Sequence, residues 1–188
     1  MNWLAHLRLA PAAPLVRLGN LCGDFVRGVE LDALHPEIVR GVEQHRAVDR
    51  FVDAHEVTRR SRRRLLPLRF AAVLVDVFYD HFLARDWDEL GDGRPLAVFT
   101  AEVYALLESH AALLPPALQR AVPVMRRQDW LLSYREVDGI DAILRRMSRR
   151  SRRAAELGDG AAALRANYSG LDSDFRALWP ELVQRSPS

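Results

Sequence analysis

The segment FAAVLVDVFYDHFLA, residues 70–84, constrains the fold more than any other part of the chain. Drawn as a helix, it is apolar around its whole circumference, so it must be buried on every side. It cannot be a membrane span, because a span needs about 18 to 20 consecutive apolar residues and the chain has no such run. The 188 residues, 49% of them hydrophobic, are enough for one domain around such a core.

Helical periodicity recurs between the prolines and glycines of the chain, whereas strand-like alternation is scarce. We therefore predict a single all-α domain over residues 1–188, with short loops and mostly antiparallel neighbouring helices. The expected helices cover residues 14–28, 36–64, 68–87, 95–113, 116–127, 137–153 and 160–184.

One predicted helix carries a row of ionisable residues. The stretch HRAVDRFVD places His45, Asp49 and Asp53 four residues apart, and this spacing aligns side chains on one helical face. At 100° per residue, His45 and Asp49 fall within the apolar stripe that faces the core, and Asp53 lies at its edge. Burying such groups costs several kcal/mol unless they are paired or bound to a metal.

The apolar segment 70–84 also places ionisable residues where we expect burial. Apart from Tyr79, its ionisable residues are Asp76, Asp80 and His81, and no arginine lies within it. One explanation is a buried ion-pair network into which Arg27 or Arg46 reaches. Another is a set of hydrogen-bonded core histidines.

Taken together, the two rows favour a metal site. Mixed imidazole and carboxylate ligands suit Mn²⁺, Fe²⁺, Zn²⁺ or Mg²⁺. A metal held in this way would activate water against a phosphoryl or acyl centre.

The N-terminal region adds further candidates. His6 lies in NWLAHL, and Asp24 lies in the glycine-rich GNLCGDFVRG, where the backbone can approach other groups closely. Asn20, Asp24 and Arg27 could converge there on a ligand. The other histidines are interpreted as surface or helix-capping residues: His35, His55 and His110.

The formal charge is only +2, but the arginines are clustered and there is no lysine. Five of six residues in 59–64 and six of nine in 145–153 are arginine. Each run could bind an anionic partner, or be a solvated helix face. Cys22 is the only cysteine, and no signal peptide is evident, so we expect a cytoplasmic protein without disulfides.

Several motifs occur in an order that resembles one family. They are MNWLAHLRLA, GNLCGDFVRG, HRAVDRFVD, VFYDHFLARDW, QDWLLSYREVDGI and LDSDFRALWPEL. In this order the chain resembles the acyl carrier protein phosphodiesterases. The resemblance implies hydrolysis of the phosphodiester that joins 4′-phosphopantetheine to a serine of acyl carrier protein. It also implies an all-helical fold like a rearranged HD phosphohydrolase, dependent on Mn²⁺ or Mg²⁺.

The resemblance also implies roles for individual residues. The expected metal ligands are Asp24, His45, Asp80 and His81. Asn20 and Asp76 would support them. The groups expected to act on water or substrate are His6, Asp24, Arg27, Arg46, Asp49 and Asp53. Either arginine of that set would stabilise phosphoryl charge, and Asp49 or Asp53 would orient the water or protonate the leaving oxygen. The acidic carrier protein is expected to dock on Arg59, Arg60, Arg62, Arg63 and Arg64.

Two other functions remain open on the sequence. The same site could serve a phosphohydrolase of nucleotides such as a guanosine polyphosphate, which would need no protein substrate. A non-enzymatic, arginine-rich helical module that binds nucleic acid would show steep salt dependence and need no metal. The second function leaves the buried histidines and aspartates unexplained, so we expect neither a nucleic-acid partner nor a membrane span.

Overall fold

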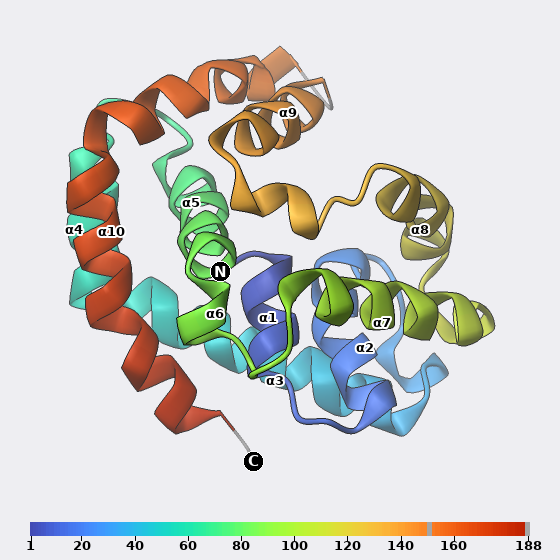
Figure 1. Cartoon of the computed structure of the whole chain (residues 1–188). Coiled ribbons are helices and arrows are strands. Elements are labelled where there is room, and N and C mark those ends of the chain that lie inside the picture. The colour runs from blue at the N-terminus through green and yellow to red at the C-terminus, as the bar shows by residue number, and fades with distance from the viewer. Residues whose placement is uncertain (150–151, 187–188) are drawn as a thin grey trace.

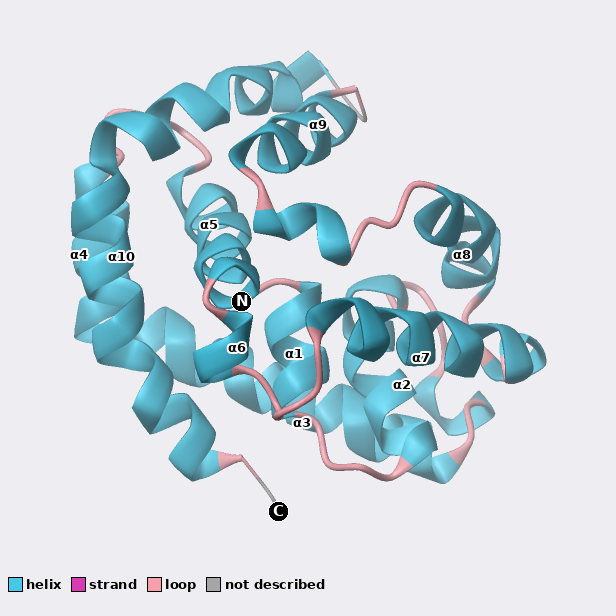
Figure 2. Ribbon diagram, viewed as in Figure 1, coloured by secondary structure: helices cyan, strands magenta, loops and turns pink. Residues whose placement is uncertain are grey.

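The computed structural model describes residues 1–149 and 152–186. These residues form helices and connecting loops, with no strand among them, which confirms the all-α prediction (Figure 2). The α-helices are α1 (Trp3–Leu9), α2 (Pro14–Cys22), α3 (Pro36–Ala54), α4 (Glu56–Arg64), α5 (Ala71–Arg85), α6 (Trp87–Leu90), α7 (Leu96–Ser109), α8 (Pro116–Arg127), α9 (Val137–Ser148) and α10 (Gly160–Arg185). The 3₁₀ segments are η1 (Gly23–Phe25), η2 (Leu31–Ala33), η3 (Ala111–Leu113), η4 (Leu132–Arg135) and η5 (Arg152–Asp159).

The apolar helix α5 lies at the centre of the bundle. It contacts α1, α4, α9 and α10, and its Val75, Phe78 and Phe82 are completely buried. In Figure 1, α4 and α10 run side by side along one flank, α2 and α7 lie beyond α1 on the other, and α3 crosses below α1 to reach α4. The helix is buried around its circumference from Val77 to Ala84, but its first turns are not, because Ala72 is exposed and Val73 and Asp76 are half-buried. Within the described residues, no helix combines the length and apolar character needed to cross a bilayer.

Several predicted helix boundaries need correction. The single helix expected over residues 36–64 is two, because His55 adopts an extended backbone (φ −77°, ψ 137°) between α3 and α4. Its side chain accepts a hydrogen bond from the Val57 amide, which caps α4. His35 caps α3 in the same way, through the Glu37 amide. Both histidines are thus the capping residues that the sequence analysis expected.

Two other predicted helices end earlier in the structure than the sequence predicts. The helix expected over residues 14–28 ends at Cys22 and continues as η1, and the one expected over 137–153 ends at Ser148. Residues 150–151 of that prediction lie outside the described part of the chain. Helices α1 and α6 are not predicted, because seven and four residues are too few for periodicity to be recognised.

Helices α2 and α3 pack with their backbones in contact. A Cβ atom on Gly19 would lie 2.2 Å from the Ile38 carbonyl oxygen, and one on Gly41 would lie 2.1 Å from the Val16 carbonyl oxygen. Only glycine fits at either position. The crossing brings the C-terminal half of α2 against the middle of α3, where the candidate site forms.

Helices α4 and α10 are joined by a buried carboxylate. Asp174 accepts hydrogen bonds from Arg60 Nε at 2.7 Å, Arg64 Nε at 2.9 Å and Ser61 Oγ at 2.8 Å. Because Ser61 donates to Asp174, its oxygen accepts from the Tyr79 hydroxyl of α5 at 2.8 Å. These bonds hold the pKa of Asp174 below its usual value although burial alone would raise it.

We predict that Asp174→Asn lowers the free energy of unfolding by about 2 kcal/mol, because two guanidinium groups then share one amide oxygen. Urea denaturation would measure the loss. The matched control is Asp53→Asn, which breaks an exposed pair with Arg62 and should cost less than about 1 kcal/mol. Equal losses in both variants would contradict the assignment of Asp174 as the link between α4 and α10.

Candidate active site

His45 is the fixed centre of the site. Its Nδ1–H donates a 2.8 Å hydrogen bond to the backbone carbonyl of Asn20, across the crossing of α3 and α2. A Cβ atom on Gly23 would lie 2.3 Å from Cγ of the imidazole, so the glycine makes room for the ring. Because a carbonyl oxygen can only accept, the donated proton is on Nδ1 and His45 presents Nε2 to the site.

Two carboxylates face that nitrogen. Asp49 Oδ2 lies 3.1 Å and Asp24 Oδ1 lies 3.7 Å from His45 Nε2. In the neutral imidazole, Nε2 carries a lone pair, and a lone pair facing carboxylate oxygens is repulsive. The arrangement is favourable only when a cation, either a proton or a metal ion, lies on Nε2.

His6 completes the cluster from α1. Its ring stacks on His45 with 3.8 Å between centroids and 22° between planes, and its Nε2–H donates to Asp49 Oδ1 at 3.1 Å. Its Nδ1 is buried without a hydrogen-bond partner among the described residues. Burial lowers the pKa of His6 to about 4, so the ring is neutral at pH 7.

The ligand-type atoms of His6, His45 and Asp49 all lie within 4.8 Å of one another. Burial alone would raise the pKa of Asp49, but its contacts with His45 and His6 and the charge of the Met1 amino group outweigh burial and hold the pKa well below its usual range. Asp49 is therefore ionised at pH 7. The structure thus brings together four of the predicted site residues: His6, Asp24, His45 and Asp49.

Asp76 and Asn20 lie beside this cluster. Asp76 Oδ1 is 3.1 Å from the amino group of Met1, which is also 3.4 Å from Asp49 Oδ1. Burial raises the pKa of Asp76, although the amino group opposes the shift. Asn20 supports His45 through its backbone carbonyl, while its side-chain amide donates to Gln44 Oε1 at 3.0 Å.

Asp80 and His81, predicted as metal ligands, do not join the cluster. Asp80 accepts from the amides of Leu4 at 2.6 Å and Ala5 at 3.3 Å, so it binds buried first-turn amides of α1 that have no partner within the helix. Burial raises the pKa of Asp80 to about 7. His81 donates from Nδ1 to the Tyr134 carbonyl at 2.8 Å and accepts at Nε2 from the Tyr168 hydroxyl at 2.9 Å. Both groups therefore use their ligand atoms within the fold.

The remaining predicted groups lie at the surface. Arg27 and Arg46 are exposed, and neither borders the pocket described below. Asp53, whose side chain is 64% exposed, pairs with Arg62 of α4. The expectation that Arg27 or Arg46 reaches into the core is therefore corrected.

The arginine run of α4 is engaged with acids of this chain. Arg60 and Arg64 pair with Asp174, Arg62 with Asp53, and Arg59 and Arg63 with Glu56. The run serves first to fix α4 on its neighbours. Its role in docking a carrier protein stays a prediction. The second run, residues 145–153, is described only in part.

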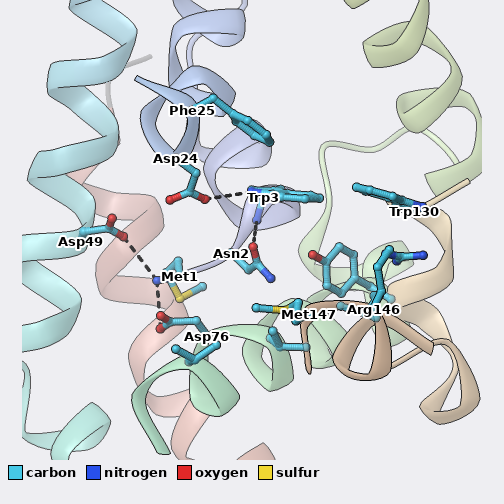
Figure 3. A pocket seen from close by; sticks show the side chains of 14 residues that line it. Met1, Asn2, Trp3, Asp24, Phe25, Asp49, Asp76, Trp130, Arg146 and Met147 are labelled. Atoms are coloured by element: carbon cyan, nitrogen blue, oxygen red, sulfur yellow. Dashed lines mark hydrogen bonds and ion pairs between the residues drawn. The ribbon is translucent and has the colours of Figure 1, made fainter. Parts of the chain in front are cut away.

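A pocket of about 310 Å³ opens beside the cluster (Figure 3). Three carboxylates, Asp24, Asp49 and Asp76, line one end of it. Trp3, Phe25, Trp130 and Arg146 form an aromatic and basic wall that sequence reasoning does not identify. The signals were that Trp3, Phe25 and Trp130 lie within the motifs that carry the family resemblance and that Arg146 lies in the arginine run 145–153.

A buried imidazole and carboxylate cluster beside a pocket is typical of hydrolytic enzymes. The sequence profile of the family "Acyl carrier protein phosphodiesterase" matches residues 1–182, so the chain belongs to this family.

Individual relatives agree with this assignment. The acyl carrier protein phosphodiesterase of Serratia proteamaculans is 35% identical over 188 residues, covering 99% of this chain and 97% of the relative. That of Escherichia coli O6:H1 is 35% identical over 191 residues, and that of Photorhabdus laumondii 31% over 188, covering 97% and 95% of those relatives. No solved structure matches, so the similarity to HD phosphohydrolases stays a prediction.

The burial of a neutral His6 predicts a pH-dependent contribution to stability. Because its pKa is about 4 in the folded state and 6.5 ordinarily, the unfolded chain binds more protons between these values. The contribution of His6 to the free energy of unfolding therefore grows as the pH rises through this window. We expect the wild-type free energy of unfolding, minus that of His6→Gln, to increase from about pH 4 to about pH 6.5 in urea titrations. A difference that stayed constant across this window would show that folding does not lower the pKa of His6.

Proposed function

We propose that the protein hydrolyses the phosphodiester between 4′-phosphopantetheine and the serine of holo acyl carrier protein. One observation carries this proposal: two buried histidines and two carboxylates converge at the end of a pocket, in a chain that belongs to the acyl carrier protein phosphodiesterase family. In this proposal the reaction takes place in the cytoplasm, because the chain has a single, buried cysteine and so does not rely on the disulfides that are common in oxidising compartments.

We further propose that the cluster holds Mn²⁺ or Mg²⁺. The donor set fits such an ion, because the lone pair of His45 Nε2 faces two carboxylates and needs a cation between them. His45, Asp49 and Asp24 would be ligands, and His6 would turn a ring nitrogen to the same ion. Imidazole together with carboxylate favours Mn²⁺ over Mg²⁺. A bound ion would polarise the phosphoryl group and lower the pKa of water.

The chain's own residues hold these groups in place. The Asn20 carbonyl fixes the tautomer of His45, and the indole N–H of Trp3 fixes Asp24 through a 2.8 Å bond to Oδ2. Such supporting hydrogen bonds orient ligands and raise their basicity.

In the reaction, the oxygen of water bonds to phosphorus as the water gives up one proton, the bond between phosphorus and the serine oxygen breaks, and the serine oxygen takes up a proton. Asp49 is a poor donor of that proton because the histidines keep it ionised. Asp53 does not border the pocket. Asp76 does border it, and burial raises its pKa, so Asp76 is the carboxyl better suited to carry the proton.

Intact-protein mass spectrometry of holo acyl carrier protein would test the activity. We expect a mass loss of one phosphopantetheine group with Mn²⁺ and none with EDTA. His45→Gln should slow the loss by about a hundredfold or more, because the group facing both carboxylates is changed. His110→Gln, at a site remote from the cluster, is the matched control. Hydrolysis of a guanosine polyphosphate in place of the carrier protein would overturn the assignment and indicate a nucleotide phosphohydrolase.

Metal binding has a readout that does not depend on turnover. At about 100 times its dissociation constant, Mn²⁺ should stabilise the folded protein by about 2.7 kcal/mol, seen as a rise in the melting temperature. The rise should disappear in His45→Gln and persist in His110→Gln. An equal rise in both variants would place the ion elsewhere.

A further inference from the structure

One wall of the pocket is a continuous stack of flat groups. The Arg146 guanidinium lies 4.0 Å from the ring centroid of Trp130. Trp130 stacks on Trp3 with 5.7 Å between centroids and 14° between planes, and Trp3 packs on Phe25 at 5.7 Å. These four side chains come from four separate segments, so the wall is assembled by the fold and not by one local motif.

Trp3 joins this wall to the cluster. Its Nε1–H donates to Asp24 Oδ2 at 2.8 Å, so the same side chain lines the pocket and orients a carboxylate beside His45. In Figure 3, Asp24 and Asp49 lie at one end of the pocket and Arg146 at the other, with Trp3 between them. A ligand whose phosphate lay at the carboxylate end would extend along the wall toward Arg146.

The chemistry of the wall selects what can lie there. Aromatic faces accept flexible chains and amide planes, and a guanidinium supplies hydrogen bonds to carbonyl oxygens. Met147 and Val73 add apolar surface, and Asn2 adds an amide. The pocket volume, about 310 Å³, is at the lower end of small-molecule sites, which run from about 300 to 1,000 Å³. These features suit a slender, uncharged chain with a few amide groups.

We propose that this pocket binds the pantetheine arm of the prosthetic group, with its amides against Trp3 and Trp130 and a carbonyl oxygen on Arg146. This inference rests on the proposed function, because the arm is the part of that substrate left over once the cluster has engaged the phosphodiester. Binding of the arm would fix the phosphate beside Asp24 and Asp49, so the pocket confers specificity for this prosthetic group.

The test uses pantetheine itself, which carries the arm but no phosphate, titrated into the full-length protein by calorimetry. We expect a dissociation constant on the order of 0.1 mM for the wild type. Val73→Phe, which adds bulk to the pocket, should weaken binding at least tenfold. Arg146→Gln keeps the length of the side chain but removes the guanidinium, and should weaken binding severalfold. Val98→Phe adds the same bulk on an exposed position of α7 and should leave binding unchanged.

Mn²⁺ binding, followed by electron paramagnetic resonance, separates the pocket from the cluster, and both pocket variants should retain it. Wild-type protein that hydrolyses holo carrier protein but does not bind pantetheine at millimolar concentration would overturn the pocket assignment and leave the proposed function intact. Equal pantetheine binding by Val73→Phe, Arg146→Gln and the wild type would also overturn it. Pantetheine binding that the pocket variants lose, without hydrolysis of holo carrier protein, would support the pocket and overturn the proposed function.

Discussion

The contact between the backbones of α2 and α3 is the constraint on which the site depends. With Gly19 and Gly41 facing each other, the two helices approach more closely than side chains would allow. Only at that separation can the Asn20 carbonyl reach His45 Nδ1 and thereby direct Nε2 toward Asp24 and Asp49. A methyl group at either glycine would push the helices apart and release the imidazole. Gly23 likewise leaves the space that the imidazole ring of His45 occupies.

Around this fixed imidazole, the site holds negative charge that is not fully compensated. Asp24 and Asp49 repel each other, and the lone pair of a neutral His45 faces both of them, so the arrangement is unfavourable unless positive charge lies among these groups. Hydrogen bonds compensate part of this negative charge, and so does the Met1 amino group, which pairs with Asp49 and Asp76. A positive charge is still needed next to His45 Nε2, and a divalent ion would supply it.

The sequence predicts the fold class well because the signals are local. The all-round apolar character of residues 70–84 and the capping histidines His35 and His55 follow from composition and neighbours in the chain. The inward direction of His45 and Asp49 follows from helical spacing alone. Asp53 lies at the edge of the apolar stripe, and its side chain is exposed and pairs with Arg62 instead of joining the cluster.

The errors concern residues whose partners are distant in sequence. Asp80 and His81 are buried ionisable groups, as predicted, and their burial correctly requires partners. Those partners are the amides of Leu4 and Ala5 and the oxygens of Tyr134 and Tyr168, which are 53 to 87 residues away in the chain. Helical periodicity says that a side chain points inward. It does not say what that side chain meets there.

The site is complete only after helix α1, which carries His6, has docked on the rest of the fold. Seven residues are too few for a helix that is stable by itself in water. Its first turn is held by Asp80, so the order of His6 depends on a contact that spans 76 residues. The entropy of closing such a long loop must be overcome before His6 can stack on His45. A partly folded chain can therefore contain most of its helices and still lack the cluster, which confines chemistry to molecules that have completed their fold.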